Sequence, residues 1–187
     1  ANTTGGSNVA IGALALDHNT TADNNVAIGY YALTSNTTGA KNVAVGRETL
    51  EANTTASDNT AIGDSAMETN TTGTGNTAVG KSALKVNTTG GANVGIGYNA
   101  LDANTTADNN TAIGYGALSA NTTGAQNTAV GQNAGSDHID GAQNLILGWN
   151  AQTAATGSSN SVTLGGDSIT DLRCADTSIS SLSDRRD

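Results

Sequence analysis

The chain has 187 residues, of which 24 are glycine, none is proline or phenylalanine, and only 3% are aromatic. So few bulky side chains exclude an ordinary globular core. The formal net charge of −9 argues against nucleic acid as a partner, because that partner requires clustered Lys and Arg, and no apolar run is long enough for membrane insertion.

From its first residues the chain repeats a short phrase, such as "NVAIG" or "NTAVG", with a period of 17 residues. Helical repeats are usually at least about 33 residues long, and a Gly and an "NTT" in every unit would interrupt a helix. We therefore predict an all-β fold, a parallel β-solenoid of about ten 17-residue coils over residues 1–165, with residues 166–187 as a cap or transition. The phrase begins with Asn at nine positions and with Ser at a tenth: Asn8, Asn25, Asn42, Asn59, Asn76, Asn93, Asn110, Asn127, Asn144 and Ser161.

Each phrase predicts a short strand that ends in a corner. In "NVAIG", Val and Ile lie on one face and Ala on the other, and we expect columns of Ile, Val and Leu to fill the interior. A second extended stretch is expected at the Ala-Leu pair, and stacked Asn side chains are expected to form amide ladders. Glycine ends the strand because a corner needs a positive φ or a close backbone approach. The corner glycines include Gly12, Gly29, Gly46, Gly63, Gly80, Gly97, Gly114 and Gly131.

After the strand comes a variable position, and after the Ala-Leu pair comes "NTT". The variable position predicts an outward column in which Tyr30, Tyr98, Tyr115 and Trp149 either stack on the rings of a glycan or pack between coils or subunits. The "NTT" phrases match the acceptor pattern for N-glycosylation. The alternative is that they are turn-forming Asn and β-favouring Thr without sugar.

The residues that carry chemistry are few and scattered. His18 and His138 are seven periods apart and cannot share a metal ion within one chain, so we expect both in loops. Asp23 and Asp108 occur in Asn-rich turns without the nine-residue pattern of calcium-binding β-rolls. Cys174 has no nearby His to activate it. We predict no enzymatic activity, no bound metal and no cofactor.

The repeated phrases from Asn8 to Gly165 resemble the head repeats of trimeric autotransporter adhesins and matching repeats of phage tail fibres. The resemblance implies a left-handed β-roll in a homotrimer. A homotrimer also fits the narrow core of a 17-residue coil, whose apolar surface needs cover. The C-terminal "SLSDRRD" resembles the start of the endosialidase-type intramolecular chaperone domain, which cuts itself away after folding. This resemblance implies a cut between Ser183 and Asp184.

Three functions follow as hypotheses. The first is a structural and adhesive segment of a phage tail fibre, part of the virion, which acts as a rigid spacer in host attachment and contacts a host cell-surface glycan or protein. The second is the head of a bacterial trimeric surface adhesin. The third is an ice-binding solenoid, against which the adjacent Thr pairs argue, because neighbours in a strand point to opposite faces.

Overall fold

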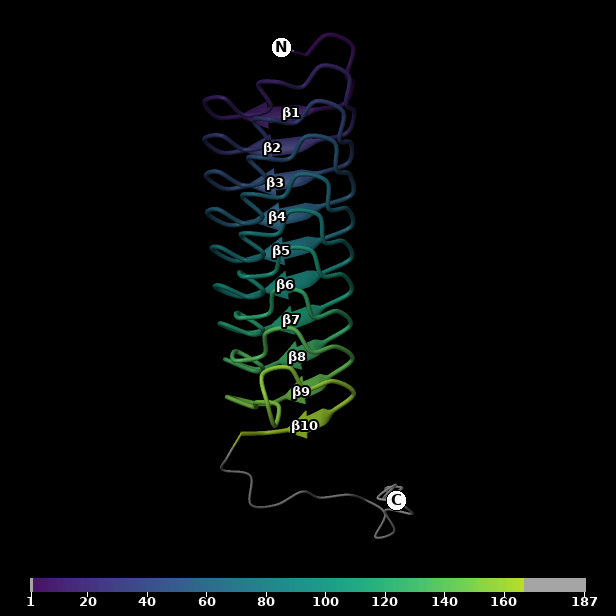
Figure 1. The fold of residues 1–187 in the computed structure, drawn as a ribbon. Helices are drawn as coiled ribbons and strands as arrows, with labels where there is room; N and C mark the ends of the chain where they lie inside the picture. The colour runs from purple at the N-terminus through teal and green to yellow at the C-terminus, as the bar shows by residue number, and fades with distance from the viewer. Residues whose placement is uncertain (1, 167–187) are drawn as a thin grey trace, which may run out of the picture.

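The described part of the chain, residues 2–166 of the computed structural model, winds into one column of stacked coils (Figure 1). Each coil contributes a three-residue strand to a single parallel sheet whose strand order follows the chain. The predicted all-β solenoid with 17-residue coils is confirmed, with about nine turns. The strands are β1 (Val9–Ile11), β2 (Val26–Ile28), β3 (Val43–Val45), β4 (Thr60–Ile62), β5 (Thr77–Val79), β6 (Val94–Ile96), β7 (Thr111–Ile113), β8 (Thr128–Val130), β9 (Leu145–Leu147) and β10 (Val162–Leu164).

The strands pair in a register of one full repeat. Val26 of β2 pairs with Val43 of β3, and Ala27 pairs with Ala44. Neighbouring coils are therefore about 4.8 Å apart, and each position of the repeat becomes a column that runs along the rod.

The interior is filled differently from the sequence prediction. Ala27, the middle residue of β2, is 0% exposed, whereas Ile62 at the end of β4 is 40% exposed. The expected interior columns of Val and Ile are thus wrong, and those side chains face outward. The reason is space: at Gly95, in the middle of β6, an added Cβ would already lie 3.4 Å from Leu84 Cγ.

One coil has room for a larger residue at the middle of its strand. Ile146 occupies the middle of β9, where every other strand has Ala, Gly or Thr, and it is fully buried. The preceding coil has Gly135 where most coils have Leu, and a Cβ on Gly135 would lie 2.9 Å from Ile146 Cδ1. The larger strand residue therefore fills the volume that the missing leucine leaves.

The leucine column does lie inside, but its backbone is not extended. Leu33 and Leu50 are fully buried with φ values of 51° and 52°, in the left-handed region. The expected second extended stretch is therefore wrong, and a series of turns replaces it. Each left-handed residue costs about 1–2 kcal/mol. Burial of a leucine side chain contributes about 1.5–3 kcal/mol and offsets that cost.

Two asparagine columns form the predicted amide ladders. In the "NTT" column, Asn36 Nδ2 donates to Asn19 Oδ1 of the preceding coil at 3.2 Å and to Gly39 O at 2.9 Å. In the column that begins each phrase, Asn25 Nδ2 donates to the same Gly39 O at 2.8 Å, and Asn25 Oδ1 accepts the backbone N–H of Asn42. Since these side chains are buried, the ladders satisfy polar groups that water cannot reach.

The corner glycines take a conformation that other residues avoid. Gly12 has a φ of 129°, and an added Cβ there would lie 2.6 Å from Gly29 O in the next coil. Both positive φ and close approach of the next coil therefore favour glycine. Residues 167–187, with Cys174, the predicted transition and the predicted cut between Ser183 and Asp184, lie outside the described residues.

Candidate functional site

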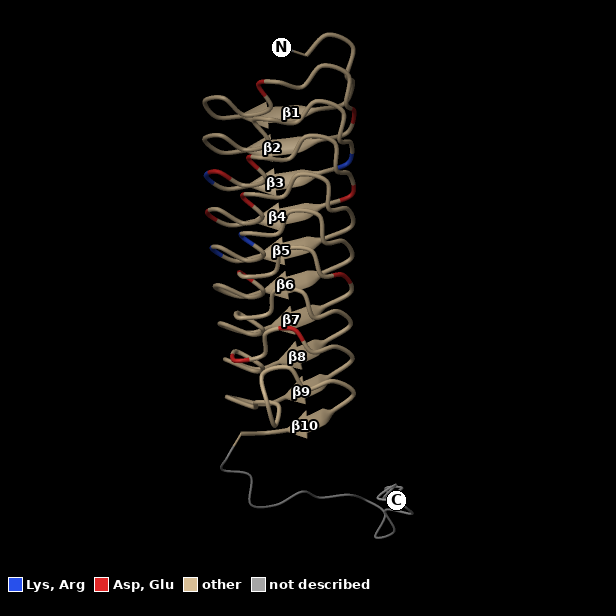
Figure 2. Ribbon diagram, in the orientation of Figure 1, with Lys and Arg blue, Asp and Glu red and all other residues tan. Residues whose placement is uncertain are grey.

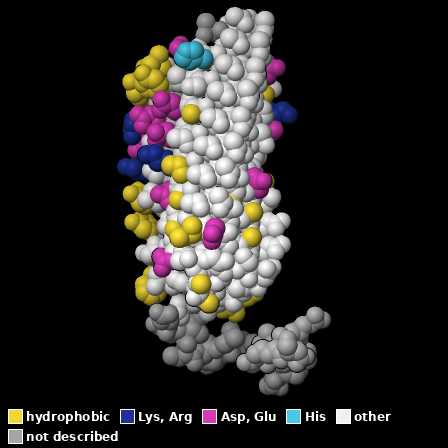
Figure 3. Space-filling model, viewed as in Figure 1, with side chains coloured by type: hydrophobic (Ala, Val, Ile, Leu, Met, Phe, Trp, Pro, Cys, Tyr) yellow, Lys and Arg dark blue, Asp and Glu magenta, His cyan; other side chains and the backbone are white. Residues whose placement is uncertain are grey.

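The residues that follow the corner glycines form an outward column, which we call the ridge. Along it, chemistry changes from aromatic to charged and back to aromatic. Figure 3 shows charged side chains along one edge of the rod, with hydrophobic groups above and below them. The ridge consists of Tyr30, Arg47, Asp64, Lys81, Tyr98, Tyr115, Gln132 and Trp149.

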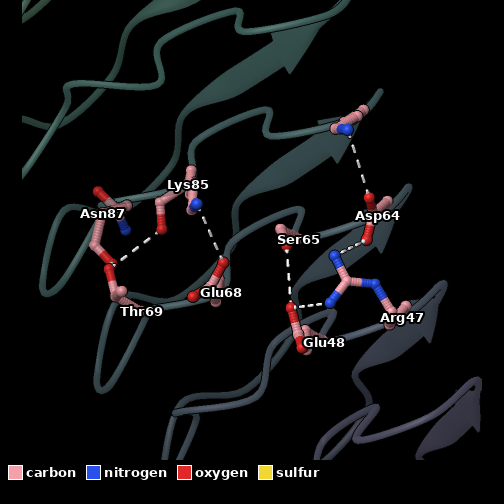
Figure 4. Close-up of polar contacts among 9 residues, drawn as sticks. Arg47, Glu48, Asp64, Ser65, Glu68, Thr69, Lys85 and Asn87 are labelled. Carbon is pink, nitrogen blue, oxygen red and sulfur yellow. Dashed lines mark hydrogen bonds and ion pairs between the residues drawn. The ribbon is translucent and has the colours of Figure 1, made fainter.

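The charged part of the ridge is paired from coil to coil. Arg47 contacts Glu48 at 2.5 Å and Asp64 of the next coil at 2.8 Å, and Lys81 Nζ lies 3.6 Å from the other Asp64 oxygen (Figure 4). Beside the ridge, burial raises the pKa of Glu51, and the carboxylates of Glu48 in the same coil and Glu68 in the next coil raise it further. These charges mostly compensate one another, so this segment is not a strong site for an ion of either sign.

The four aromatic side chains proposed as glycan contacts are all exposed, but they do not form one cluster. Tyr30 packs edge-on against Tyr31, with ring centroids 4.3 Å apart. Tyr98 and Tyr115 stack at 5.1 Å and 15°, so each covers one face of the other. Trp149 is 64% exposed and makes no ring contact within residues 2–166. Contacts between aromatic rings thus account for part of the tyrosine surface but for none of the surface of Trp149.

A second outward surface is the strand face, formed by the first and third residue of every strand. Its residues are Val, Ile, Leu or Thr in all ten strands, and Figure 2 shows the charged residues confined to the loops. Exposed members include Ile62, Ile96, Ile113 and Val130. Sequence reasoning missed this surface because it assigned these side chains to the interior.

The third surface is the threonine corner, formed by both Thr columns of the "NTT" phrases. Thr37 Oγ1 donates to Thr54 O of the next coil at 3.0 Å, while Thr38 is exposed. Neither column is buried, because the phrase lies in a bend and not in a strand. The premise that these adjacent Thr residues lie in a strand is therefore wrong.

Burial also bears on the glycosylation hypothesis. Asn2 of the first "NTT" phrase is exposed, but in the other seven phrases the amide nitrogen of the asparagine is buried and donates within the ladder. A sugar on this atom is incompatible with the stacked rod. The seven buried acceptors are Asn19, Asn36, Asn53, Asn70, Asn87, Asn104 and Asn121.

The two histidines lie far apart, and only one is in a surface loop. His18 is exposed, and its Nδ1 lies 2.8 Å from Thr34 O. His138 is 1% exposed and takes the place of a ladder asparagine, with Nε2 2.8 Å from Gly141 O. His138 does lie outside the strands, as expected, but it is buried and interrupts the ladder: Asn121 Oδ1 of the preceding coil has no hydrogen-bond partner.

The acidic residues of the Asn-rich turns accept hydrogen bonds from the backbone. Asp23 Oδ1 accepts the N–H of Gly6 at 2.6 Å, and Asp108 Oδ1 accepts that of Gly91 at the same distance. Within the described residues no three His, Cys, Asp or Glu side chains gather as metal ligands do. In the same residues no helix is long and apolar enough to span a membrane.

Comparison with known proteins adds no identity. A scan against protein-family models found no matching family, and searches of curated proteins and of solved structures found no match. The surfaces themselves therefore carry the functional argument.

Proposed function

We propose that the chain is a rigid segment of a phage tail fibre, in which three copies associate through their strand faces and the ridge points outward toward the host. The observation that carries this proposal is the strand face. It is apolar or Thr along ten coils and has no charged residue, on a chain whose net charge is −9. Continuous apolar surfaces of this extent mark association sites.

Association through this face is also electrostatically permitted. The Asp, Glu, Lys and Arg side chains of the described coils lie in the loops, so copies that meet at the strands do not bring like charges together (Figure 2). A parallel sheet is typically covered on both faces. In this rod the leucine column covers the inner face, and partner copies would cover the outer one.

The oligomeric state tests the proposal. Sedimentation equilibrium should give three times the chain mass of 18.4 kDa. The double variant Ile96→Lys/Ile113→Lys, which charges two neighbouring coils of the strand face, should sediment as a folded monomer with an unchanged circular dichroism spectrum. The matched control Thr89→Lys/Thr106→Lys places the same charges on the exposed threonine corner and should remain trimeric. A monomeric parent chain, or a strand-face variant that stays trimeric, would refute the proposal.

Whether the trimer belongs to a virion or to a bacterial surface is a separate question. A bacterial surface adhesin head would use the same trimeric rod. Mass spectrometry of purified virions and of bacterial surface fractions distinguishes the two, since the tail-fibre proposal expects the chain in the virion.

Ice binding remains a second candidate because of one observation. Both Thr columns reach the surface, and the regular strand face is uncharged. A monomer that shows thermal hysteresis in a freezing assay would favour this function over the fibre. A trimer without hysteresis would exclude it.

A further inference from the structure

The part of the ridge that follows β7, β8 and β9 differs from the charged part. Tyr115, Gln132 and Trp149 occupy the ridge on three successive coils, and all three are exposed. Gln132 makes no side-chain hydrogen bond within residues 2–166, and Trp149 contacts no ring. An exposed indole and a free amide on a rigid scaffold are groups available to a ligand.

The spacing of the two rings suits one sugar. Tyr98 covers the face of Tyr115 that points to the preceding coil, so the open face of Tyr115 points toward the coil of Gln132. Trp149 lies two coils beyond Tyr115, a separation of roughly 9–10 Å along the rod. A gap of that length between two aromatic side chains admits the thickness of one pyranose ring, and Gln132 belongs to the coil between them.

Charge decides which sugar fits. The described coils from residue 86 onward contain Asp102, Asp108, Asp137 and Asp140 but no Lys or Arg. A carboxylated or sulfated glycan would find no cation there and would be repelled by the acidic side chains. An uncharged sugar carries no charge for these carboxylates to repel.

We propose that Tyr115, Gln132 and Trp149 bind one pyranose ring of an uncharged polysaccharide that lies along the rod. Tyr115 and Trp149 hold the two faces of the sugar, and the Gln132 amide exchanges hydrogen bonds with its hydroxyls. This inference rests on the proposed role in host attachment, and it names the class of glycan and the coils that contact it.

Trp149 makes the test direct, because it is the only tryptophan of the chain. The trimeric parent protein is titrated with uncharged probes (dextran, mannan, galactan and chitin oligosaccharides) and with anionic probes (alginate and polysialic acid). At least one uncharged probe should shift Trp149 emission to shorter wavelength and protect it from iodide quenching. The anionic probes should do neither.

Variants then assign the site. Loss of one stacked ring should weaken binding about tenfold. This is expected for Tyr115→Ala by fluorescence and for Trp149→Ala by retention on the immobilised probe, and Gln132→Ala should weaken binding severalfold. The matched control is Tyr30→Ala, which removes an exposed ring from the same ridge seven coils away from Trp149 and should not change binding. All variants should keep the melting temperature of the parent.

Binding to none of the uncharged probes, or to anionic probes alone, would overturn the inference. Full binding by Tyr115→Ala and Trp149→Ala would do so as well. Neither outcome changes the sedimented mass, so the fibre proposal would stand. Conversely, a monomeric chain that binds dextran through Trp149 would overturn the trimer and leave this site in place.

Discussion

Removal of one ladder asparagine should cost more stability than its small side chain suggests. Asn70 Nδ2 donates to Asn53 Oδ1 at 3.2 Å and to Gly73 O at 3.0 Å, and Asn70 Oδ1 accepts from Asn87 at 2.8 Å. In Asn70→Ala, Gly73 O and Asn87 Nδ2 each keep another partner, but Asn53 Oδ1 is left buried with none. The orphaned oxygen costs about 1–3 kcal/mol and the other two lost bonds about 1 kcal/mol each, so the free energy of unfolding should fall by about 3–5 kcal/mol.

Guanidinium unfolding followed by circular dichroism, at one fixed protein concentration, measures this loss. The control is Thr72→Ala in the same coil, which removes an exposed side chain and should change the free energy by less than about 0.5 kcal/mol. Asn70→Asp, which keeps the shape but replaces the donor with a carboxylate oxygen, should be destabilised at pH 7. It should recover as the pH falls, since burial raises the pKa of such a carboxyl and the protonated form can donate. Equal stability of Asn70→Ala and Thr72→Ala would refute the ladder argument.

Three further changes test other columns. Gly80→Ala should lose at least about 3 kcal/mol or fail to fold, because its φ is 133° and the new Cβ would lie 2.5 Å from a backbone oxygen of the next coil; Gly6→Ala, with an ordinary φ and a new Cβ 3.7 Å from its nearest neighbour, Asp23 Oδ1, should unfold like the parent. His138→Asn should raise the free energy of unfolding by about 1 kcal/mol, because the new amide can donate to the orphaned Asn121 Oδ1, and a lower midpoint would contradict this. Glu51→Gln should stabilise the rod at pH 7, because burial raises the pKa of Glu51 in the folded state and its ionised form is disfavoured there. That gain should vanish below the ordinary value of 4.5, where both states are protonated, and thermal melts at pH 7 and pH 3 measure it.

The period of the sequence was enough to predict the sheet. A repeat of 17 residues with Gly at one fixed position places equivalent strands side by side in parallel and in chain order, as β1 to β10 are. It also predicts the Asn ladders, because it brings identical amides of successive coils within hydrogen-bonding distance of one another. These features depend on periodicity and not on which side chains face inward.

Which face of the strand points into the core could not be predicted from the same pattern. "VAI" alternates between two faces, and hydrophobicity assigns the larger residues to the core, yet the 3.4 Å distance at Gly95 leaves room only for Ala. The left-handed backbone of Leu33 also lacks a local signal, since left-handed positions favour Gly and Asn. A signal existed two positions earlier: this column, also left-handed, contains Asn99, Gly116 and Asn133. It marks a series of turns where a second strand was expected.

Repeats this similar raise the question of how one coil is distinguished from the next. In a misfolded rod, one coil could be skipped so that its two neighbours stack directly on each other. The Asn, Ala and Gly columns would pair there as they do in the correct fold, so they do not disfavour this misfolded state. The ridge does, because skipping the coil of Asp64 would place Arg47 against Lys81, two like charges in place of two ion pairs. The core does so too, because Ile146 fits over Gly135 and would overlap the leucine, or in one coil Met67, that occupies this position in the earlier coils. The uniform columns therefore provide most of the stability, and the irregular positions specify the order in which the coils stack.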